Sequence, residues 1–379
     1  MATETETTSG PGPVDGGPDG PVASLRTYVE GPNTVGQSRP FWAGFVVAVL
    51  ALAAYPAIVG GYQASRFSLF MVYAFLGLSL SLVWGYAGIL SFGQVVFFGV
   101  AGYTFGVVAV NFATPAGITA AFFAGIVGGA LMAAVLGYFM FYGGVRDVYV
   151  TIITLVSTLV LHTFMAQTAG DEWTVGKAAL GGFNGMPTIP NLAFGVEGAA
   201  VRFGSVSFYY LVLVLLVGTY LGLRALVNSD YGRVMVAVRE DEDRTRMFGY
   251  DVERVKLVVF TVGGALAGLS GVLYAAWGNY VSPQVFELAF ASLPVIWASV
   301  GGRKTLLGAA AATIGIEFFR NSLGGEWALV AVGVLLLVFV LGLPGGIVPW
   351  VHDRYLGFRT DAGGPAPPES AENPEVTDS

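Results

Sequence analysis

The sequence has no cysteine, only two histidines and few charged side chains, and each shortage excludes a class of protein. Without cysteine there are no disulfides and no thiolate metal sites, and His162 and His352 are far apart in the sequence. We therefore predict no metal and no cofactor. Charged residues make up 11% of the chain and hydrophobic residues 55%, whereas soluble globular proteins have roughly 25% charged residues. This composition predicts a chain that lies mostly in lipid.

Recurring motifs of ATP and ester chemistry are missing as well. The phosphate-binding loop G-x-x-x-x-G-K-[ST] does not occur, and the nearest strings are GGRKT at 301–305 and the dipeptide Gly176–Lys177. The sequence also lacks H-E-x-x-H and G-x-S-x-G. A net charge of −7 provides no basic stripe for nucleic acid. We predict a non-catalytic chain that neither hydrolyses ATP itself nor binds nucleic acid.

Long apolar runs are what the sequence has in abundance. A hydrocarbon core about 30 Å thick needs about 20 apolar residues per helical crossing, and no charged residue or histidine occurs from Phe67 to Val145. Glu287 and Pro294 interrupt the eighth apolar run, which predicts a broken or re-entrant helix whose freed backbone groups are covered by protein. We expect ten crossings, at residues 41–60, 67–86, 95–112, 117–141, 148–166, 208–227, 257–279, 285–301, 305–323 and 327–343.

Positive charge is distributed unequally among the predicted loops, and this predicts the orientation in the membrane. With the N-terminus inside, fourteen of the 18 Lys and Arg residues fall on the cytoplasmic side, and only Arg66, Lys177, Arg202 and Arg320 fall outside. The split also favours an even number of crossings. We expect an all-α polytopic membrane protein with both termini in the cytoplasm.

Three regions follow from this pattern. Residues 1–40, rich in Thr, Gly, Pro and acids, are expected to form a disordered tail and not a cleavable signal peptide. Residues 351–379 are expected to form a second disordered, acidic tail. The membrane domain between them, 41–350, has an external connection at 167–207, expected to lie over the outer mouth, and a cytoplasmic connection at 228–256.

The cytoplasmic connection concentrates the charge that the rest of the chain lacks. Asn228, Ser229 and Asp230 offer helix N-caps, and Val234 and Val238 recur at helical spacing. The pairs Glu240 with Arg244 and Glu242 with Arg246 are predicted to support a helix at i,i+4, and Gly249 is predicted to end it. We therefore expect a folded element, although a charged loop that only stays solvated and fixes the topology remains an alternative.

A second alternative concerns the acidic run from Glu240 to Asp243. Clustered carboxylates hold Mg²⁺ in membrane transferases that act on phosphorylated lipids. Each acid of this run has a basic residue beside it or at helical spacing, whereas a metal site leaves its carboxylates free. We rank the enzyme hypothesis low for that reason.

Polar residues within the apolar runs are few and mark the candidate translocation path. In YAGILSFGQ (86–94), Ser91 and Gln94 lie among glycines where one span ends and the next begins. Such a break is suited to line a pathway, and we add Tyr103, Ser282 and Trp297 to the candidates. Intramembrane charge is nearly absent, and Glu317 and Arg320, at i,i+3, are expected to pair with each other.

Six blocks of the sequence follow one another in an order typical of a known family. They are WGYAGILSFGQVVFFGVAGYTFG (84–106), VYVTIITL (148–155), GRVMVAVREDEDRTRMFGYDVERVK (232–256), ALAGLSGVLYA (265–275), YVSPQVF (280–286) and GGRKTLLG (301–308). With these blocks the chain resembles the larger permease subunit of ATP-binding-cassette importers for branched-chain amino acids and urea. The resemblance covers roughly residues 67–350 and leaves out the tails and the first span. Gln94 stands where a histidine is common and Lys304 where a glycine is common, so no role is transferred to either side chain.

The resemblance implies a role for the charged connection. In this family the loop after the sixth span docks in a groove of the ATP-hydrolysing subunit. The positions that carry this over are Gly232, Arg233, Arg239, Glu240, Asp241 and Gly249. The implied partners are a second related permease, two ATP-binding subunits, an extracytoplasmic solute-binding protein and membrane lipid.

The resemblance also bears on the substrate. RTRMFGYDVERVK (244–256) and VIWASVGGRKTLLG (295–308) look closer to the urea and short-chain amide branch, and sparse intramembrane charge agrees with a neutral solute. Our expectation is therefore urea, with leucine, isoleucine or valine as the alternative, because in these importers the binding protein does most of the selecting. A stand-alone secondary carrier or channel is the alternative from another class.

Overall fold

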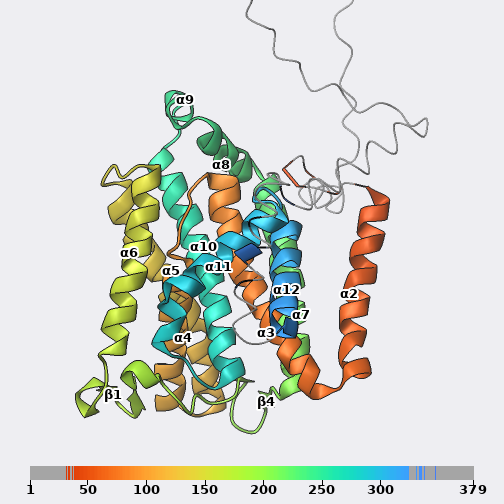
Figure 1. The fold of residues 1–379 in the computed structure, drawn as a ribbon, viewed down its shortest axis with the longest axis vertical. Coiled ribbons are helices and arrows are strands. Elements are labelled where there is room, and N and C mark those ends of the chain that lie inside the picture. Colours follow the sequence, from red (N-terminus) through yellow and green to blue (C-terminus); the bar gives the residue numbers. More distant parts are fainter. Residues whose placement is uncertain are drawn as a thin grey trace, which may run out of the picture.

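A computed structural model describes residues 38–323 without interruption, together with residues 31, 33, 34, 36, 330, 333, 334, 337 and 346. In this part of the chain, long helices run side by side between two ends (Figure 1). One end carries the short helices α8 (Asp230–Glu240) and α9 (Glu242–Met247), and we call it the charged end. The other carries four short strands and is called the hairpin end.

Seven helices among the described residues are long and apolar enough to cross a membrane, which confirms the polytopic all-α prediction. From Phe67 to Val145, the stretch free of charge, the structure forms three of them, as expected. The seven are α2 (Arg39–Val59), α3 (Gly61–Leu80) with its π-helical continuation η1 (Ser81–Tyr86), α4 (Gln94–Asn111), α5 (Pro115–Phe141), α6 (Asp147–Ala166), α7 (Ser205–Asn228) and α10 (Val252–Gly278).

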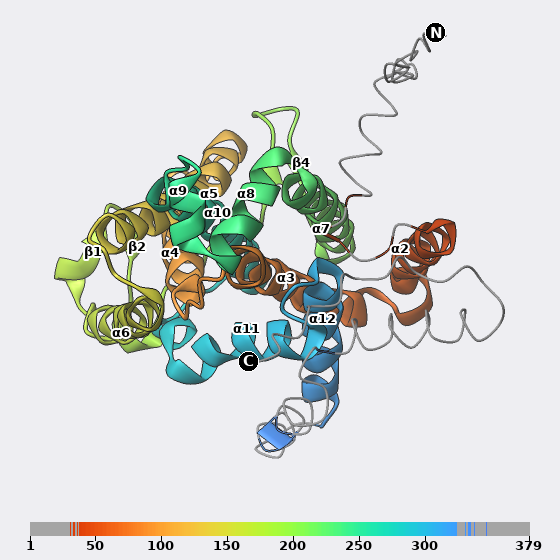
Figure 2. The ribbon, with the colours of Figure 1, turned by 90° about the horizontal axis from the view of Figure 1, so that it is seen from above.

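Helices α4, α5 and α10 pack closely because glycines face one another where they meet. A Cβ added to Gly271 of α10 would lie 1.9 Å from the carbonyl oxygen of Phe98 in α4, and one on Gly129 of α5 would lie 2.9 Å from the Cα of Gly268. Helices in lipid associate through such close backbone contact, since burial away from water gives no advantage there. Viewed from above, α3, α4 and α10 occupy the centre, and α2 and α6 lie at opposite edges (Figure 2).

The eighth predicted crossing is broken, as expected. After α10 the chain forms a 3₁₀ turn, η4 (Pro283–Phe286), an extended Glu287 and then α11 (Leu288–Gly301). The 14 residues of α11 span about 21 Å at 1.5 Å per residue, less than the hydrocarbon core. The chain nevertheless passes between the two ends, because Val281 pairs with Met186 at the hairpin end and the turn after α11 contacts η1 at the charged end.

A second break separates η1 from α4 and is covered by protein. Thr151 of α6 donates a hydrogen bond to the Leu90 carbonyl at 3.0 Å, and Thr154 accepts one from the Phe92 amide at 3.2 Å. Irregular backbone at membrane depth needs such partners because lipid supplies none. The threonines of α6 thus satisfy one carbonyl and one amide of residues 87–93.

The connection 167–207 is folded over the hairpin end, with two features that we did not predict. It contains two hairpins, β1 (Thr174–Val175) with β2 (Ala178–Ala179) and β3 (Ala193–Phe194) with β4 (Val201–Arg202). Thr119 of α5 donates to the Ala193 carbonyl at 3.2 Å. These short strands leave the chain an all-α protein.

The count of ten crossings is not established by the described residues. The ninth predicted span corresponds to α12 (Leu306–Leu323). Most of the tenth, 327–343, lies outside the described residues, as do most of the two predicted tails. Four residues just before α2 are described, and the side chain of Asn33 donates to the Val227 carbonyl at 2.7 Å, so this segment lies against the charged end of α7.

The glycine contacts predict that a larger side chain destabilises the bundle only at glycines that touch a neighbouring helix. We expect Gly271→Leu to lose most of the monodisperse protein extracted in detergent, because the Phe98 backbone cannot yield and overpacking costs about 1–3 kcal/mol or more. Gly218→Leu in α7 is the matched control, since nothing lies within 4 Å of its added Cβ. Size-exclusion chromatography of both variants measures the effect, and equal yields would contradict this packing.

The absence of native cysteine allows a clean test of orientation. Met247 at the charged end is 86% exposed and Phe183 at the hairpin end is 63% exposed. Since the basic residues predict a cytoplasmic charged end, we expect a membrane-impermeant maleimide to label Phe183→Cys in intact cells. Met247→Cys should react only after permeabilisation. The reverse pattern would invert the topology.

Candidate functional site

The charged connection folds into two helices, α8 and α9, and a side chain caps the N-terminus of each. The Ser229 hydroxyl accepts from the Gly232 amide at 3.2 Å and begins α8, and the Asp241 carboxylate accepts from the Arg244 amide at 2.8 Å and begins α9. Asp251 caps α10 in the same way, at 2.9 Å from the Arg254 amide. These N-caps satisfy amides that a helix start leaves without partners. The prediction of a folded element is confirmed.

Gly249 ends this unit as the sequence predicted. Its backbone has a φ of +88°, the region that favours glycine, and its amide donates to the Arg246 carbonyl at 3.0 Å. Nothing lies within 4 Å of a Cβ built on Gly249. Its role is therefore conformational.

Helix α8 is seated on the membrane helices through one apolar face. Met235 and Val238 are fully buried, and the Tyr231 hydroxyl donates to the Val255 carbonyl of α10 at 3.1 Å. A Cβ on Gly232 would lie 2.2 Å from the Val227 carbonyl oxygen, so only glycine fits where α7 turns into α8. The buried partners are Met235 and Val238, whereas Val234 is only partly covered.

The predicted i,i+4 ion pairs are wrong. Asp241 is extended, with φ −159° and ψ 102°, and this break between α8 and α9 removes the shared helix face that those pairs need. Glu240 instead pairs with Arg239 at 2.5 Å and with Lys304 at 3.7 Å, and Glu242 pairs with Lys256. Arg244 pairs with Asp241 at 3.6 Å and Arg246 with Asp243 at 3.1 Å, both at i,i+3.

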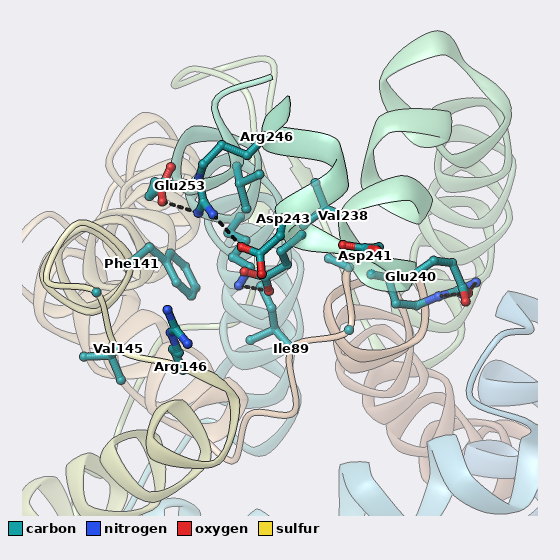
Figure 3. Close-up of a pocket in the computed structure, with 17 residues that line it drawn as sticks. Ile89, Phe141, Val145, Arg146, Val238, Glu240, Asp241, Asp243, Arg246 and Glu253 are labelled. Carbon is teal, nitrogen blue, oxygen red and sulfur yellow. Dashed lines mark hydrogen bonds and ion pairs between the residues drawn. The ribbon is translucent and has the colours of Figure 1, made fainter. Parts of the chain in front are cut away.

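Between this unit and the membrane helices lies a cavity of about 630 Å³. Its walls are the start of the 87–93 break, the turn after α5, and the facing ends of α8, α9 and α10. Figure 3 shows Arg146 pointing into it from below α9, opposite Asp243 and the Arg246–Glu253 pair, which is closed at 2.7 Å. Hydrogen bonding from Arg239, together with the charges of Arg239 and Lys304, lowers the pKa of the Glu240 carboxyl below its ordinary value.

The tip of the unit exposes large apolar side chains, a feature that sequence reasoning missed. Met247 is 86% exposed, Phe248 77% and Tyr250 50%. They lie next to Gly249 and project from the charged end. The sequence contains a signal for this tip, because three large apolar residues interrupt a run of charges. These residues do not follow the helical spacing from which the other features of the connection were predicted.

The predicted loop residues divide into buried and exposed ones. Gly232 is buried and the Arg239 side chain is 16% exposed, so both contact the bundle. Arg233 is 68% exposed and pairs with Asp230 of its own helix. Glu240 and Asp241 line the cavity.

Candidates for the translocation path lie in the interior at three places. Ser91 and Gln94 are buried at the 87–93 break, where Gln94 accepts from the Ser79 hydroxyl of α3 at 2.6 Å. Tyr103 is nine residues further along α4, about 13 Å away at 1.5 Å per residue. Its ring stacks on Phe286 of η4, the turn that Ser282 precedes. The structure therefore brings Tyr103 and Ser282 to one region but leaves Gln94 in another.

Trp297 marks the third place, at the centre of an aromatic cluster. Its ring stacks on Tyr73 of α3 with centroids 5.8 Å apart, and Tyr73 in turn contacts Tyr274 and Phe290. Three of the five candidates hold a buried polar atom without a hydrogen-bond partner among the described residues: Gln94 Nε2, Tyr103 Oη and Trp297 Nε1. Such atoms cost about 1–3 kcal/mol each, and buried polar atoms of this kind suit a path that a polar solute enters.

Glu317 and Arg320 pair as predicted, with Oε2 and Nη2 2.7 Å apart. The Glu317 side chain is 2% exposed, and its Oε1 has no hydrogen-bond partner among the described residues. It lies in α12 beside the Trp297 region, where both Tyr73 and Trp297 interact with it. Charge within the bundle is therefore sparse but not absent.

Comparisons with known proteins find a family model and bacterial relatives that match most of this chain. The family model described as "Branched-chain amino acid transport system / permease component" matches residues 63–343, beginning after α2. The high-affinity branched-chain amino acid transport system permease protein LivM of Escherichia coli is 29% identical over 337 residues, which cover 82% of this chain and 76% of LivM. LivM of Salmonella typhimurium is 28% identical with the same coverage.

A more distant similarity reaches the archaea. A probable branched-chain amino acid transport permease protein LivM of Methanocaldococcus jannaschii is 25% identical over 189 residues, 45% of this chain and 53% of that protein. No solved structure matches significantly. The family model covers most of the helical domain, and the two bacterial relatives extend over four-fifths of the chain. The chain therefore belongs to the family of permease components of branched-chain amino acid transport systems.

Proposed function

We propose that this chain is the membrane subunit of an ATP-driven importer and that its charged end docks on an ATP-binding partner in the cytoplasm. The observation that supports this proposal is the structure of the α8–α9 unit. Met235 and Val238 pack it against the bundle, and its tip exposes Met247, Phe248 and Tyr250. Large apolar and aromatic side chains are the residues that anchor interfaces. The surrounding ion pairs supply the polar rim of such an interface.

The energy source lies on the partner in this proposal. The sequence has no phosphate-binding loop, so ATP is hydrolysed by two ATP-binding subunits. The remaining partners are a second related permease that completes the pathway and a solute-binding protein at the hairpin end. The connection over that end, which ties Met186 to Val281 next to η4, offers that protein a structured surface.

Transport follows from alternating access of the two permeases around the path. Closure of the ATP-binding subunits would push on α8 and α9 and rock the helices to which they are joined. The broken segment with η4 and α11 is suited to move, because half-helices and irregular turns at membrane depth form the sites and gates of transporters. Of the candidate path residues, Gln94 begins α4 after the 87–93 break, Tyr103 stacks on η4, and Trp297 lies in α11.

For the substrate, the relatives favour branched-chain amino acids over urea, which the sequence pattern alone favoured. Both bacterial relatives are named for branched-chain amino acid transport. The Glu317–Arg320 pair, in which Glu317 is 2% and Arg320 30% exposed, provides both signs of charge within the bundle, which a zwitterion needs for its ammonium and carboxylate and urea does not. Urea and short-chain amides remain the second candidate, because charged residues are few within the described spans.

A stand-alone carrier would need no ATPase and would leave the exposed tip without a function. The membrane-enzyme alternative requires free carboxylates, but Glu240, Asp241, Glu242 and Asp243 each have a basic partner in the structure. The geometry of the unit therefore favours docking over catalysis.

The docking proposal predicts that a charge at the tip prevents assembly. We expect Phe248→Asp to reduce co-purification of the ATP-binding subunits, since losing a buried aromatic anchor costs about 2 kcal/mol or more, about thirtyfold in Kd. Phe183→Asp at the hairpin end is the control, because Phe183 is similarly exposed, at 63%. Unchanged association of Phe248→Asp would count against a docking role.

The substrate proposal predicts uptake of labelled leucine by cells that express this chain with its partner subunits. Excess isoleucine or valine should suppress that uptake, and excess urea should not, because an amino acid presents charged groups that urea lacks. Cells lacking this chain provide the control. Uptake of labelled urea that leucine does not suppress would decide for the amide branch.

A further inference from the structure

Arg239 joins α8 to the membrane helices at one point. Although it lies in the last turn of a short helix at the charged end, its side chain is only 16% exposed. Its Nη1 donates to the carbonyl oxygen of Gly85 at 2.5 Å, and its Nε and Nη2 donate to Glu240 Oε1 at 3.0 and 2.5 Å. One guanidinium thus binds the end of η1 and the neighbouring carboxylate together, a use suited to its planar fork of donors.

Gly85 belongs to η1, the π-helical end of the α3 segment. Carbonyls at a helix C-terminus lack intrahelical partners, and a cation is favoured there. Close by, Gly88 has a φ of +77°, and a Cβ built on it would lie 3.0 Å from Arg239 Cγ. A side chain at Gly88 would therefore crowd this arginine.

The same end of η1 holds the turn between α11 and α12. Ser81 donates to the Arg303 carbonyl at 3.3 Å, and the Tyr86 hydroxyl donates to the Lys304 carbonyl at 3.1 Å. A Cβ on Gly85 would lie 1.9 Å from the Arg303 carbonyl oxygen, so the turn rests directly on the η1 backbone. Lys304 of this turn also pairs with Glu240, its Nζ lying 3.7 Å from Glu240 Oε1.

We infer that Arg239, Glu240 and Lys304 form a linkage through which a push on α8 reaches the turn before α12 and so moves the broken helix α11. Arg239 is a positioning residue that acts through the Gly85 carbonyl, and it does not touch the transported solute. This inference rests on the proposed docking of α8 and α9 on an ATP-binding partner. It adds the route by which motion enters the membrane helices.

The exposure and position of these three side chains distinguish a role in coupling from a role in stability or in docking. Glu240 is 61% exposed and Lys304 53%, and ion pairs this exposed contribute little to folding. The π-helical turn of η1 is a geometry found frequently at functional sites. Arg239 and Glu240 are among the positions implied for docking, but the Arg239 side chain is 16% exposed and donates to Gly85, and none of the three side chains belongs to the apolar tip formed by Met247, Phe248 and Tyr250. We therefore expect their loss to reduce transport more than assembly or folding.

The test measures transport per ATP hydrolysed in proteoliposomes containing the whole complex. We expect Arg239→Gln to retain its ATP-binding subunits and its ATP hydrolysis while uptake falls about tenfold, and Lys304→Gln to lose uptake by a smaller factor. The double variant should be no worse than Arg239→Gln alone, because both belong to one linkage. Arg239→Lys should recover part of the loss, since an ammonium still reaches a carbonyl without forking.

Arg39→Gln is the matched control, because Arg39 is exposed at the start of α2 and lies outside both the charged connection and the residues matched by the family model. Normal transport per ATP in Arg239→Gln would overturn the linkage, and so would a parallel loss of ATP-binding subunits, which would assign Arg239 to docking. If Arg239→Gln is not monodisperse, Lys304→Gln alone decides, and unchanged coupling there overturns the inference. Failure of the wild-type chain to bind any ATP-binding subunit would instead refute the proposed function.

Discussion

The rest of this structure depends on one constraint: in lipid, every backbone amide and carbonyl must find a partner within the protein. Continuous helices meet the constraint by themselves, which is why most of the chain is plain helix. The chain departs from helix within the membrane at residues 87–93 and again around η4 and Glu287. At the first departure, Thr151 and Thr154 of α6 partner the Leu90 carbonyl and the Phe92 amide. Just before the second, Val281 pairs with Met186 of the connection over the hairpin end.

These departures are where the polar candidates gather, and the constraint explains the coincidence. A segment that leaves the helix must be enclosed by other helices, and enclosure also makes a place where polar side chains are screened from lipid. Gln94 begins the helix after the first break and shares the Ser79 hydroxyl with the carbonyl of Gly263. Tyr103 stacks on η4 at the second break. The close glycine contacts among α4, α5 and α10 hold the enclosing helices near enough for this arrangement.

How far the sequence could predict this depended on whether the signal was local. The seven spans found among the described residues, the Ser229 cap, the Gly249 stop and the Glu317–Arg320 pair follow from spacing along the chain, and the structure confirms them. The charge pairs around Glu240 were predicted wrongly because the extended Asp241 breaks the helix, and an aspartate can be a helix residue or a cap with the same neighbours. Lys304 as a partner of Glu240 could not be predicted, because the two are brought together only by the packing of η1 against the α11–α12 turn.

The placement of charge separates the end of the molecule that would receive energy from the part that would form the path. Within the spans, charge is costly, and the described part of the chain places most of its charge at the charged end, where it folds two helices and lines a cavity of about 630 Å³. An energy source bound at that end can act on the path only through contacts that cross from the charged unit into the helices. Tyr231, Met235 and Val238 fasten α8 to α10 and the bundle, whereas Arg239 alone among the ion-paired residues of α8 donates to a membrane-helix carbonyl in the described part of the chain. The contact made by Arg239 therefore leads from α8 to η1, against which the turn after the broken helix α11 packs.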